Sequence, residues 1–202
     1  MKMVSKIILA SSSPRRKELL EKLGLRFEVI PSLIDEIPLR GESPEDFALR
    51  ASTEKALSVS RNLDGDSVVI GADTIVVIDG EILGKPNDEK EATIMLEKIG
   101  GKEQRVITGF SIVKPKAEIL YRNFVESRVK IKTLAPWEIE GYIKTGEPMD
   151  KAGAYGAQGI GAFMIEEISG SYTNVVGLPL AQVIGVLTRL GVLKLFGEYE
   201  RI

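Results

Sequence analysis

The hydrophobic pattern near the N-terminus predicts a strand, a helix and a loop, in that order. The continuous apolar run "KIILA" at 6–10 is typical of a buried strand. Ser13 and Pro14 follow as a helix start, because serine caps free helical N–H groups and proline suits the first helical position. Leucines at helical spacing extend this helix to Gly24, and two prolines predict a loop over 31–43.

The next part of the chain predicts a helix, a strand and a hairpin. Ser43 repeats the helix-start pattern, in a capping box with aspartate in place of glutamate, and predicts a helix over 44–60. The run "SVVIGAD" at 67–73 predicts a buried strand that ends in a carboxylate. The segment 74–84 then predicts a hairpin, because Asp79–Gly80 is a favoured two-residue turn.

The remaining pattern predicts further helices on either side of long strands. Asn87 is expected to cap a helix over 88–99, and alternating apolar and polar residues over 104–134 predict two or three strands. Pro136 opens another helix, a glycine-rich stretch with little helix signal follows, and a last helix is expected over 179–190.

Helices mixed with hairpin-linked strands predict an α/β fold with a mixed, twisted sheet, in a single domain over 1–202. No apolar run reaches the length needed to span a bilayer, and the N-terminus lacks a secretory signal pattern. We therefore expect a cytoplasmic protein with no membrane partner. A net charge of −2 argues against a nucleic-acid partner, since nucleic-acid-binding domains are usually basic.

Two residue types are missing, and their absence narrows the chemistry. The chain has no cysteine and no histidine, which excludes thiolate nucleophiles, imidazole bases and zinc sites built from these residues. Catalysis must then use carboxylates, lysine, arginine, hydroxyl groups or an oxygen-bound metal. Mg²⁺ or Mn²⁺ is the cofactor that suits carboxylate ligands.

The segment "SSSPRR" at 11–16 places positive charge where a helix disfavours it. The start of a helix carries partial positive charge, so Arg15 and Arg16 oppose it electrostatically. A bound anion would offset this cost, because free N–H groups and two guanidinium groups then converge on it. The alternative is that both arginines are solvated.

Two further segments carry candidate chemistry. In "GADTIVVIDGEILGKP", Asp73 would lie at the rim of the sheet, and the hairpin would bring Lys85 close to it, as a carboxylate and a phosphate-binding cation. A capping aspartate and a surface lysine are the alternative. In the glycine-rich stretch 146–159, a solvent loop is the alternative to a ligand site, for which the polar candidates are Glu147, Asp150, Lys151 and Gln158.

Five stretches in order resemble the Maf family of nucleoside triphosphate pyrophosphatases. They are "LASSSPRRKELL", "ASTEKA", "GADTIVVIDGEILGKP", "GEPMDKAGAYGAQG" and "NVVGLPL", which together span 9–180. The resemblance implies an elongated mixed sheet in two lobes around a cleft, as in inosine triphosphate pyrophosphatases. It also implies Mg²⁺- or Mn²⁺-dependent cleavage between the α and β phosphates, often in a homodimer.

The resemblance also implies roles for individual residues. The catalytic position falls on Asp73, and the predicted metal ligands are Asp73 and Glu36. The resemblance assigns substrate choice to Arg15, Thr74 and Gln158. It assigns phosphate binding to Ser11, Arg16, Lys55 and Lys85. Further pocket contacts fall on Glu36, Asp150 and Lys151. On physical grounds alone, the expected place of Lys55 is a solvated helix surface, and the alternative for Glu36 is an ordinary surface carboxylate in a loop.

The segment "DKAGAYGAQG" resembles the branch that prefers dTTP and UTP, with modified pyrimidine nucleotides as further substrates. Phe110 and Ser127 stand where the family usually has Val and Thr, a small change of pocket shape. Two alternatives remain: a 7-methylguanosine-triphosphate pyrophosphatase, and a regulator of septum formation that binds nucleotide without turnover. The family's link to septum formation also implies a role in cell-division arrest.

Overall fold

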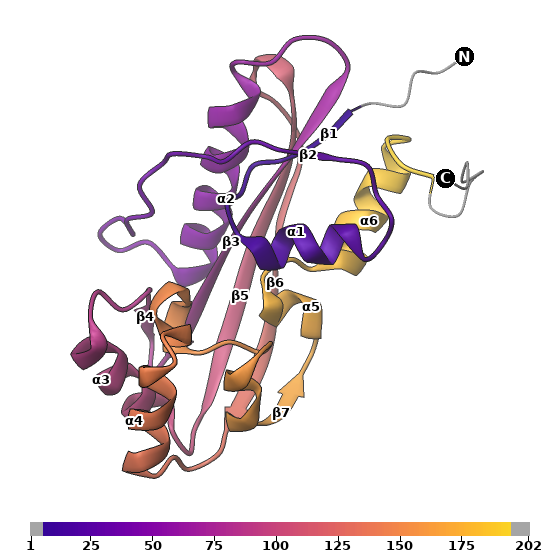
Figure 1. Cartoon of the computed structure of the whole chain (residues 1–202). Helices are drawn as coiled ribbons and strands as arrows, with labels where there is room; N and C mark the ends of the chain where they lie inside the picture. Colours follow the sequence, from indigo (N-terminus) through magenta and orange to yellow (C-terminus); the bar gives the residue numbers. More distant parts are fainter. Residues whose placement is uncertain (1–5, 195–202) are drawn as a thin grey trace.

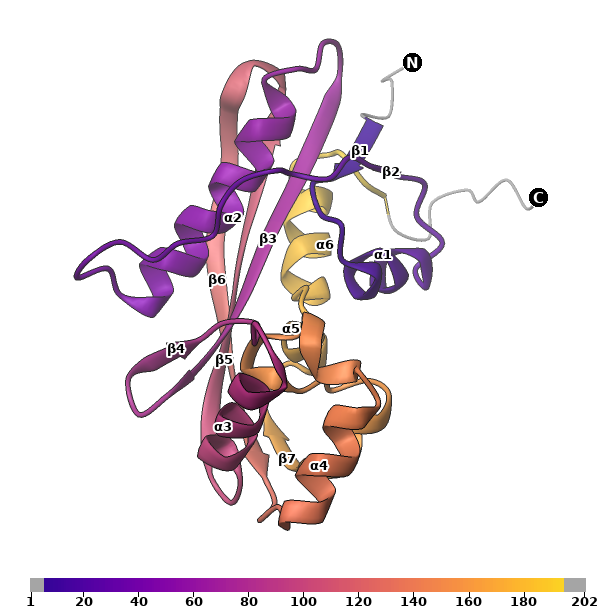
Figure 2. The same cartoon turned by 60° about the vertical axis from the view of Figure 1, so that its left-hand side comes forward.

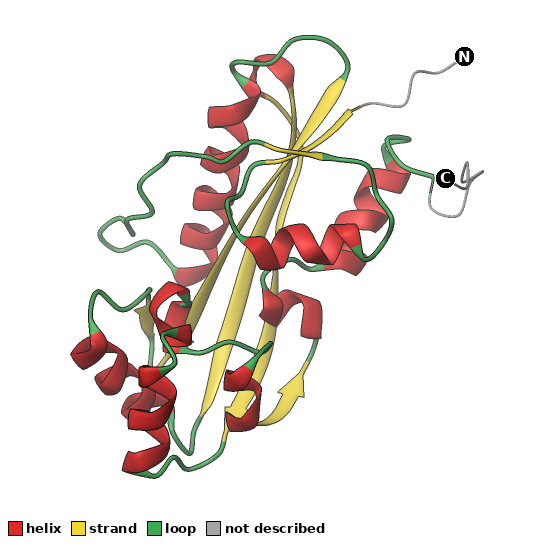
Figure 3. Cartoon of the chain, viewed as in Figure 1, coloured by secondary structure: helices red, strands yellow, loops and turns green. Residues whose placement is uncertain are grey.

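The computed structural model describes residues 6–194 and shows one seven-stranded mixed sheet with helices on both faces (Figures 1 and 3). The ends of the domain predicted over 1–202 lie outside the described residues. The strands are β1 (Lys6–Leu9), β2 (Glu28–Val29), β3 (Ser67–Ile78), β4 (Glu81–Leu83), β5 (Glu103–Lys114), β6 (Glu118–Ile131) and β7 (Ile165–Ser169). The helices are α1 (Pro14–Glu21), α2 (Pro44–Ser60), α3 (Glu89–Ile99), α4 (Pro136–Lys144), α5 (Tyr172–Val176) and α6 (Leu180–Arg189). Short 3-10 turns are η1 (Pro115–Ala117), η2 (Glu147–Asp150), η3 (Ala152–Ala154) and η4 (Ile160–Met164).

The strand order is β2-β1-β3-β5-β6-β7, with β4 paired to β3. Strand β1 runs parallel to β2 and β3, and every other pairing is antiparallel. This confirms the predicted α/β class with a mixed sheet. The long strands β3, β5 and β6 run through both halves of the molecule, with α1 and α6 beside one half and α3 and α4 beside the other (Figure 1). The expected two lobes therefore share one continuous sheet.

One face of β3 contributes to two separate hydrophobic clusters. Val68, Ile70 and Ala72 pack with apolar residues of α1 and α6, whereas Val76 and Ile78, on the same face, pack with α3 and α4. Between these two clusters the face carries a polar residue, Thr74. A separation of the lobes is therefore built into the sequence of a single strand.

The other face of β3 and β5 is covered by α2, and Figure 2 shows α2 and α6 on opposite sides of the long strands. Glycines allow this contact to be close. A Cβ atom on Gly71 would lie 2.2 Å from the Ser52 carbonyl oxygen, and one on Gly109 would lie 2.1 Å from that of Ala48. The backbone of α2 thus packs directly against the sheet, which sets the distance between its side chains and the strands.

Most predicted elements are confirmed, with corrections at their ends. The cap of α3 is Asp88 rather than Asn87, because the Asp88 carboxylate accepts the Glu91 N–H. Ser13 occupies the N-cap position of α1, but its side chain forms no capping hydrogen bond. The Asp79–Gly80 turn is confirmed, with both residues at positive φ.

The strand predicted to end at residue 73 does not end there. Strand β3 continues through it to Ile78, so the predicted rim of the sheet was wrong as a strand end. The sequence pattern also did not predict β2, β7 or α5, which are only two to five residues long.

Candidate active site

The middle of β3 has no neighbouring strand along one of its edges. The neighbouring strand β1 pairs with β3 only as far as Ile70, and β4 pairs with it only from Val76 onward. Between these points Asp73 and Thr74 have no strand beside them on that edge. Their side chains point to opposite faces of the strand, and both reach one cavity through this gap. The rim predicted from sequence is therefore a gap within the sheet.

The cavity has a volume of about 270 Å³ and collects residues from distant parts of the chain. Its walls come from the loop before α1, from α2, from β3 and from the glycine-rich segment after α4. All the site residues implied by the family resemblance line it, namely Ser11, Arg15, Arg16, Glu36, Lys55, Asp73, Thr74, Lys85, Asp150, Lys151 and Gln158.

Lys55 joins two carboxylates at the cavity wall. Its Nζ lies 2.6 Å from Asp73 Oδ1 and 2.7 Å from Glu36 Oε1. Lys55 and Asp73 are buried, while Glu36 is partly exposed on the loop between β2 and α2. Burial acts to raise the pKa of Asp73, but the charges of Lys55 and Arg16 outweigh it, so the pKa of this carboxyl is lowered. Asp73 is therefore ionised at neutral pH.

Arg16 is buried, and its guanidinium is held by protein groups. It donates to the Gly177 carbonyl at 2.7 Å, to Ser11 Oγ at 3.1 Å and to Thr74 Oγ1 at 3.1 Å. Burial lowers its pKa, but a guanidinium keeps its proton in proteins. Arg16 thus ties the start of α1 to β3 and to the turn after α5. This corrects the alternative that both arginines are solvated.

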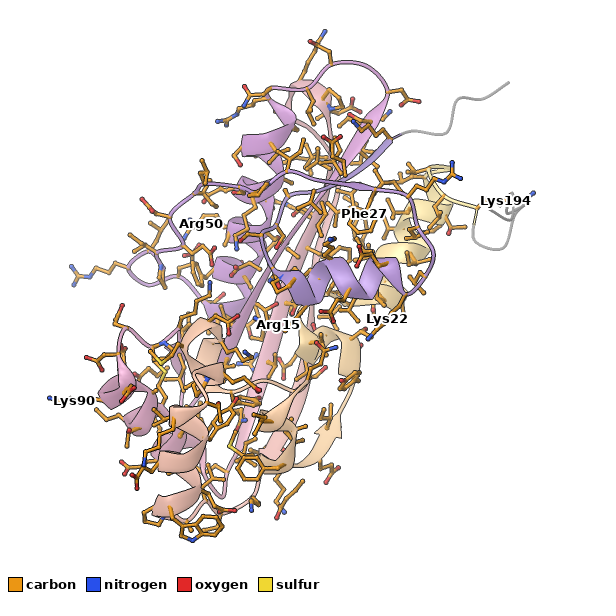
Figure 4. The ribbon with its side chains drawn as sticks, in the orientation of Figure 1. Arg15, Lys22, Phe27, Arg50, Lys90 and Lys194 are labelled. Carbon is orange, nitrogen blue, oxygen red and sulfur yellow. The ribbon has the colours of Figure 1, made fainter. Side chains whose placement is uncertain are left out.

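Arg15 behaves differently from its neighbour. It lies at the start of α1, on the side that faces the other lobe (Figure 4), and donates to Asp150 at 3.0 Å. Lys151 donates to the other oxygen of Asp150 at 2.7 Å and to the Glu147 carbonyl, also at 2.7 Å. Burial acts to raise the pKa of Asp150, but Lys151 and Arg15 outweigh it and lower the pKa. The Arg15–Asp150 pair connects the two lobes across the cavity, and Lys151 supports Asp150 from within the same segment.

Lys85 and Gln158 are available to a ligand. Within residues 6–194, neither side chain forms a hydrogen bond or an ion pair with another residue. Together the cavity residues include five cationic side chains and three carboxylates, which leaves an excess of positive charge. Such a cavity favours a polyanion over a neutral ligand.

A buried network behind Thr74 was not predicted from the sequence. The hydroxyls of Thr74 and Thr108 lie 2.9 Å apart, and Thr108 donates to the Asn174 carbonyl at 3.0 Å. The Asn174 amide donates to the Val106 carbonyl and to Ser127 Oγ, each at 3.0 Å. Strand alternation marks Ser127 and Thr108 as inward-facing, but only the fold brings them to Asn174.

Tyr155 also lines the cavity and was missed. Its hydroxyl accepts a hydrogen bond from the Gln104 amide at 3.1 Å, and burial raises its pKa to about 12. It remains a neutral phenol at physiological pH. It stands among glycines and alanines, and its aromatic character was the only signal available in the sequence.

The number and placement of the carboxylates decide whether they fit a metal ion. The described part of the chain contains no group of three or more acidic residues that would form an all-protein metal site. Asp73 and Glu36 nevertheless lie close together, because both carboxylates contact the same Lys55 Nζ atom. Mg²⁺ is usually bound by one or two carboxylates together with water and substrate phosphates, so this pair fits such an ion.

Comparison with known proteins shows which family this chain belongs to. A family model described as "Maf-like protein" matches residues 6–190. This chain is a member of the Maf-like family. A dTTP/UTP pyrophosphatase of Clostridioides difficile is 50% identical over 190 residues, covering 94% of this chain and 97% of that protein. A dTTP/UTP pyrophosphatase of Geobacter sulfurreducens is 50% identical over 188 residues, covering 93% and 98%.

Two solved structures are partly similar to this Maf-like chain. A nucleoside-triphosphatase / dITP/XTP pyrophosphatase from Mycobacterium abscessus gives a TM-score of 0.40 at 16% identity, covering 92% of this chain and 97% of that one. The Staphylococcus aureus Ham1 protein gives a TM-score of 0.44 at 16% identity, covering 79% of each chain.

No helix within residues 6–194 of the Maf-like chain has the length and apolar character needed to cross a membrane.

Proposed function

We propose that this chain hydrolyses nucleoside triphosphates, dTTP and UTP first among them, to the nucleoside monophosphate and pyrophosphate. The observation that carries the proposal is the buried, ionised Asp73 at a gap in the sheet, facing a cavity with an excess of cationic groups. The choice of dTTP and UTP rests on the relatives of that name at about half identity over nearly the whole chain.

The cationic side chains account for substrate binding. A nucleoside triphosphate carries roughly four negative charges near neutral pH, and these must be neutralised before a nucleophile can approach. Lys85 is exposed and Arg15 is half-buried at the cavity, and the buried Lys55 and Arg16 supply positive charge from its wall. Ser11 and Thr74 carry hydroxyls beside Arg16 that hold it in place.

Asp73 accounts for the hydrolytic step. Its carboxylate would orient a water molecule and accept its proton, while the water oxygen forms a bond to the α-phosphorus. The bond from that phosphorus to the oxygen bridging to the β-phosphorus breaks, and pyrophosphate leaves. Asp73 and Glu36 would also hold the divalent cation, Mg²⁺ or Mn²⁺, which supplies charge neutralisation when bound.

The far end of the cavity would hold the base. Gln158 offers both a donor and an acceptor, and it is free of protein partners within the described residues. Thr74 and Arg15 also line the cavity and would complete the choice of nucleotide. The expected homodimer, the cytoplasmic location and the role in cell division stay predictions.

A panel of nucleoside triphosphates, incubated with the protein and Mg²⁺ and assayed for pyrophosphate, tests the proposal. We expect the greatest release from dTTP and UTP, with less from purine nucleotides. Release of phosphate in place of pyrophosphate would contradict the cleavage position. Preference for 7-methylguanosine triphosphate would favour the other family branch, and tight binding without release would favour a nucleotide-sensing regulator.

A further inference from the structure

The Glu147 carboxylate holds the glycine-rich segment 156–161 although it does not itself line the described cavity. Its Oε1 accepts hydrogen bonds from the Tyr142 hydroxyl at 3.0 Å and from the Gly161 N–H at 2.9 Å. Its Oε2 accepts the Ile160 N–H at 2.9 Å. Both oxygens of one side chain are therefore committed to α4 and to the end of this segment.

Tyr142 holds the other end of the same segment. Its hydroxyl accepts the Gly156 N–H at 3.3 Å while it donates to Glu147. Gln158 lies between these two anchored ends and faces the cavity without a protein partner of its own among the described residues. The position of Gln158 thus depends on two side chains that do not belong to its segment.

The glycines of this segment are fitted closely around the two side chains. Gly159 has φ of 76°, and a Cβ atom there would lie 2.8 Å from Glu147 Oε2. A Cβ atom on Gly161 would lie 2.5 Å from the Tyr142 hydroxyl. A general surface loop would not need such contacts, so the segment is shaped around Glu147 and Tyr142.

The protonation states support these directions of donation. Burial acts to raise the pKa of Glu147, but the N–H groups of Gly161 and Ile160 and the Tyr142 hydroxyl outweigh it and lower the pKa. Burial, with Glu147 beside it, raises the pKa of Tyr142. A fixed acceptor therefore faces a fixed donor across the physiological pH range.

Lys151, a cation of the same cavity, is held by different atoms. Lys151 donates to the main-chain oxygen of Glu147 and to the Asp150 carboxylate. Neither bond uses the carboxylate of Glu147. A change confined to that carboxylate should move Gln158 and leave Lys151 in place.

We propose that Glu147 and Tyr142 are positioning residues for nucleotide choice, which act by fixing Gln158 in the cavity. The proposal rests on the pyrophosphatase function proposed above. It assigns the pair no contact with the substrate and no part in proton transfer. Their effect is on which base is accepted.

Glu147→Gln tests the proposal. The amide keeps one oxygen, but its NH₂ group faces a backbone N–H of Ile160 or Gly161, which then loses its acceptor. The matched control is Glu140→Gln, which makes the same chemical change on α4 at an exposed carboxylate whose one ion-pair partner within residues 6–194 is Lys144. The readouts are kcat and KM for dTTP, UTP, dCTP and dATP, and inhibition by inorganic tripolyphosphate, which has no base.

The expected result is selective. In Glu147→Gln, the ratio of kcat/KM between dTTP and the other nucleotides falls by up to about tenfold, the loss expected from removing the Gln158 side chain itself, chiefly through KM for dTTP, because the hydrogen-bonding group is misplaced. The inhibition constant of tripolyphosphate stays at the wild-type value, and Glu140→Gln matches wild type throughout. An unchanged nucleotide ratio overturns the proposal, as does an equal loss for all nucleotides together with weaker tripolyphosphate inhibition.

Tyr142→Phe provides a second test if Glu147→Gln fails to fold. Removing the hydroxyl frees the Gly156 N–H and leaves Glu147 bound to the other end, so a smaller loss of the same ratio is expected. A normal ratio in a folded Tyr142→Phe protein contradicts the proposal. Wild-type protein that releases no pyrophosphate from any nucleotide would instead refute the proposed function, so the two failures are distinguishable.

Discussion

Lys55 and Asp73 meet 2.6 Å apart between a helix and a strand whose backbones are in direct contact. Both side chains are buried, and Glu36 completes the group from a loop. The charges of Lys55 and Arg16 hold the pKa of Asp73 below its usual range, and the charged carboxylate is the state needed to bind a cation or to accept a proton. This relationship underlies the predictions that follow.

Replacing Asp73 by asparagine should lower turnover of dTTP by about 100- to 10,000-fold, the usual contribution of a positioned general base. The amide has nearly the same shape, so circular dichroism should show an unchanged fold. Asp79→Asn serves as the control, because Asp79 is an exposed turn residue paired with Lys102. Near-normal turnover in Asp73→Asn would refute the catalytic assignment.

The pH dependence of stability should report the lowered pKa of Asp73. A carboxyl whose folded pKa lies below its unfolded value, about 3.9, stabilises the folded state fully above that value. The contribution is lost as pH falls through the folded pKa. The difference in unfolding free energy between wild type and Asp73→Asn, from urea titrations, should be equal at pH 7 and pH 5 and should shrink at pH 3. A difference that is constant down to pH 3 would contradict the direction of the shift.

The close contact of α2 with the sheet predicts a strong effect of one methyl group. In Gly71→Ala the new Cβ would collide with the Ser52 carbonyl, so α2 must move and carry Lys55 with it. We expect a loss of about 1–3 kcal/mol in unfolding free energy, together with reduced turnover. Gly185→Ala on α6 is the control, since its Cβ meets open space and should be neutral or slightly stabilising. Unaltered stability in Gly71→Ala would show that the contact is looser than described.

Metal removal should abolish turnover if Asp73 and Glu36 hold a divalent cation with the substrate phosphates. Treatment with EDTA is expected to stop pyrophosphate release, and Mg²⁺ or Mn²⁺ should restore it. Glu36→Gln should raise the Mg²⁺ concentration required for half-maximal activity. Lys17→Gln, at an exposed lysine of α1, tests for nonspecific effects of altered charge. Full activity in EDTA would exclude the proposed metal dependence.

Gln158→Ala should change the ranking of nucleotides more than it changes stability. Because the Gln158 side chain has no protein partner among the described residues, its removal leaves no buried group unpaired. We expect a shift of about tenfold in the kcat/KM ratio of dTTP to dCTP and an unchanged melting temperature. Gln182→Ala, at an exposed position of α6, is the control. The same ranking in wild type and Gln158→Ala would reject the role.

Local sequence signals predicted the long elements well. Helices α2 and α3 and the Asp79–Gly80 turn follow from caps and glycines in their own segments. Local signals did not predict the full length of β3, because the polar residues Asp73 and Thr74 interrupt its apolar pattern and indicate a strand end. Only the pairing of β1 and β4 with β3 shows that this pair marks a gap in the sheet.

The site could be predicted as a set of residues but not as an arrangement. The family resemblance named the residues that line the cavity, whereas neither it nor the local pattern predicted that Arg16 is buried among protein acceptors. Its three acceptors come from segments far apart in the chain, so their convergence is a property of the fold. The same reason hid Asn174, whose partners lie on β5 and β6.

The contacts at Gly71 and Gly109 also bear on how this chain tolerates change. Main-chain atoms of α2 and of the strands set the spacing of Lys55 and Asp73, so the apolar side chains around them need not hold it. Leucine, isoleucine and valine in the two lobes can then exchange over evolutionary time while the site keeps its geometry. The site geometry therefore depends on two glycines that carry a hydrogen atom where other residues carry a Cβ, and not on the identity of the core side chains.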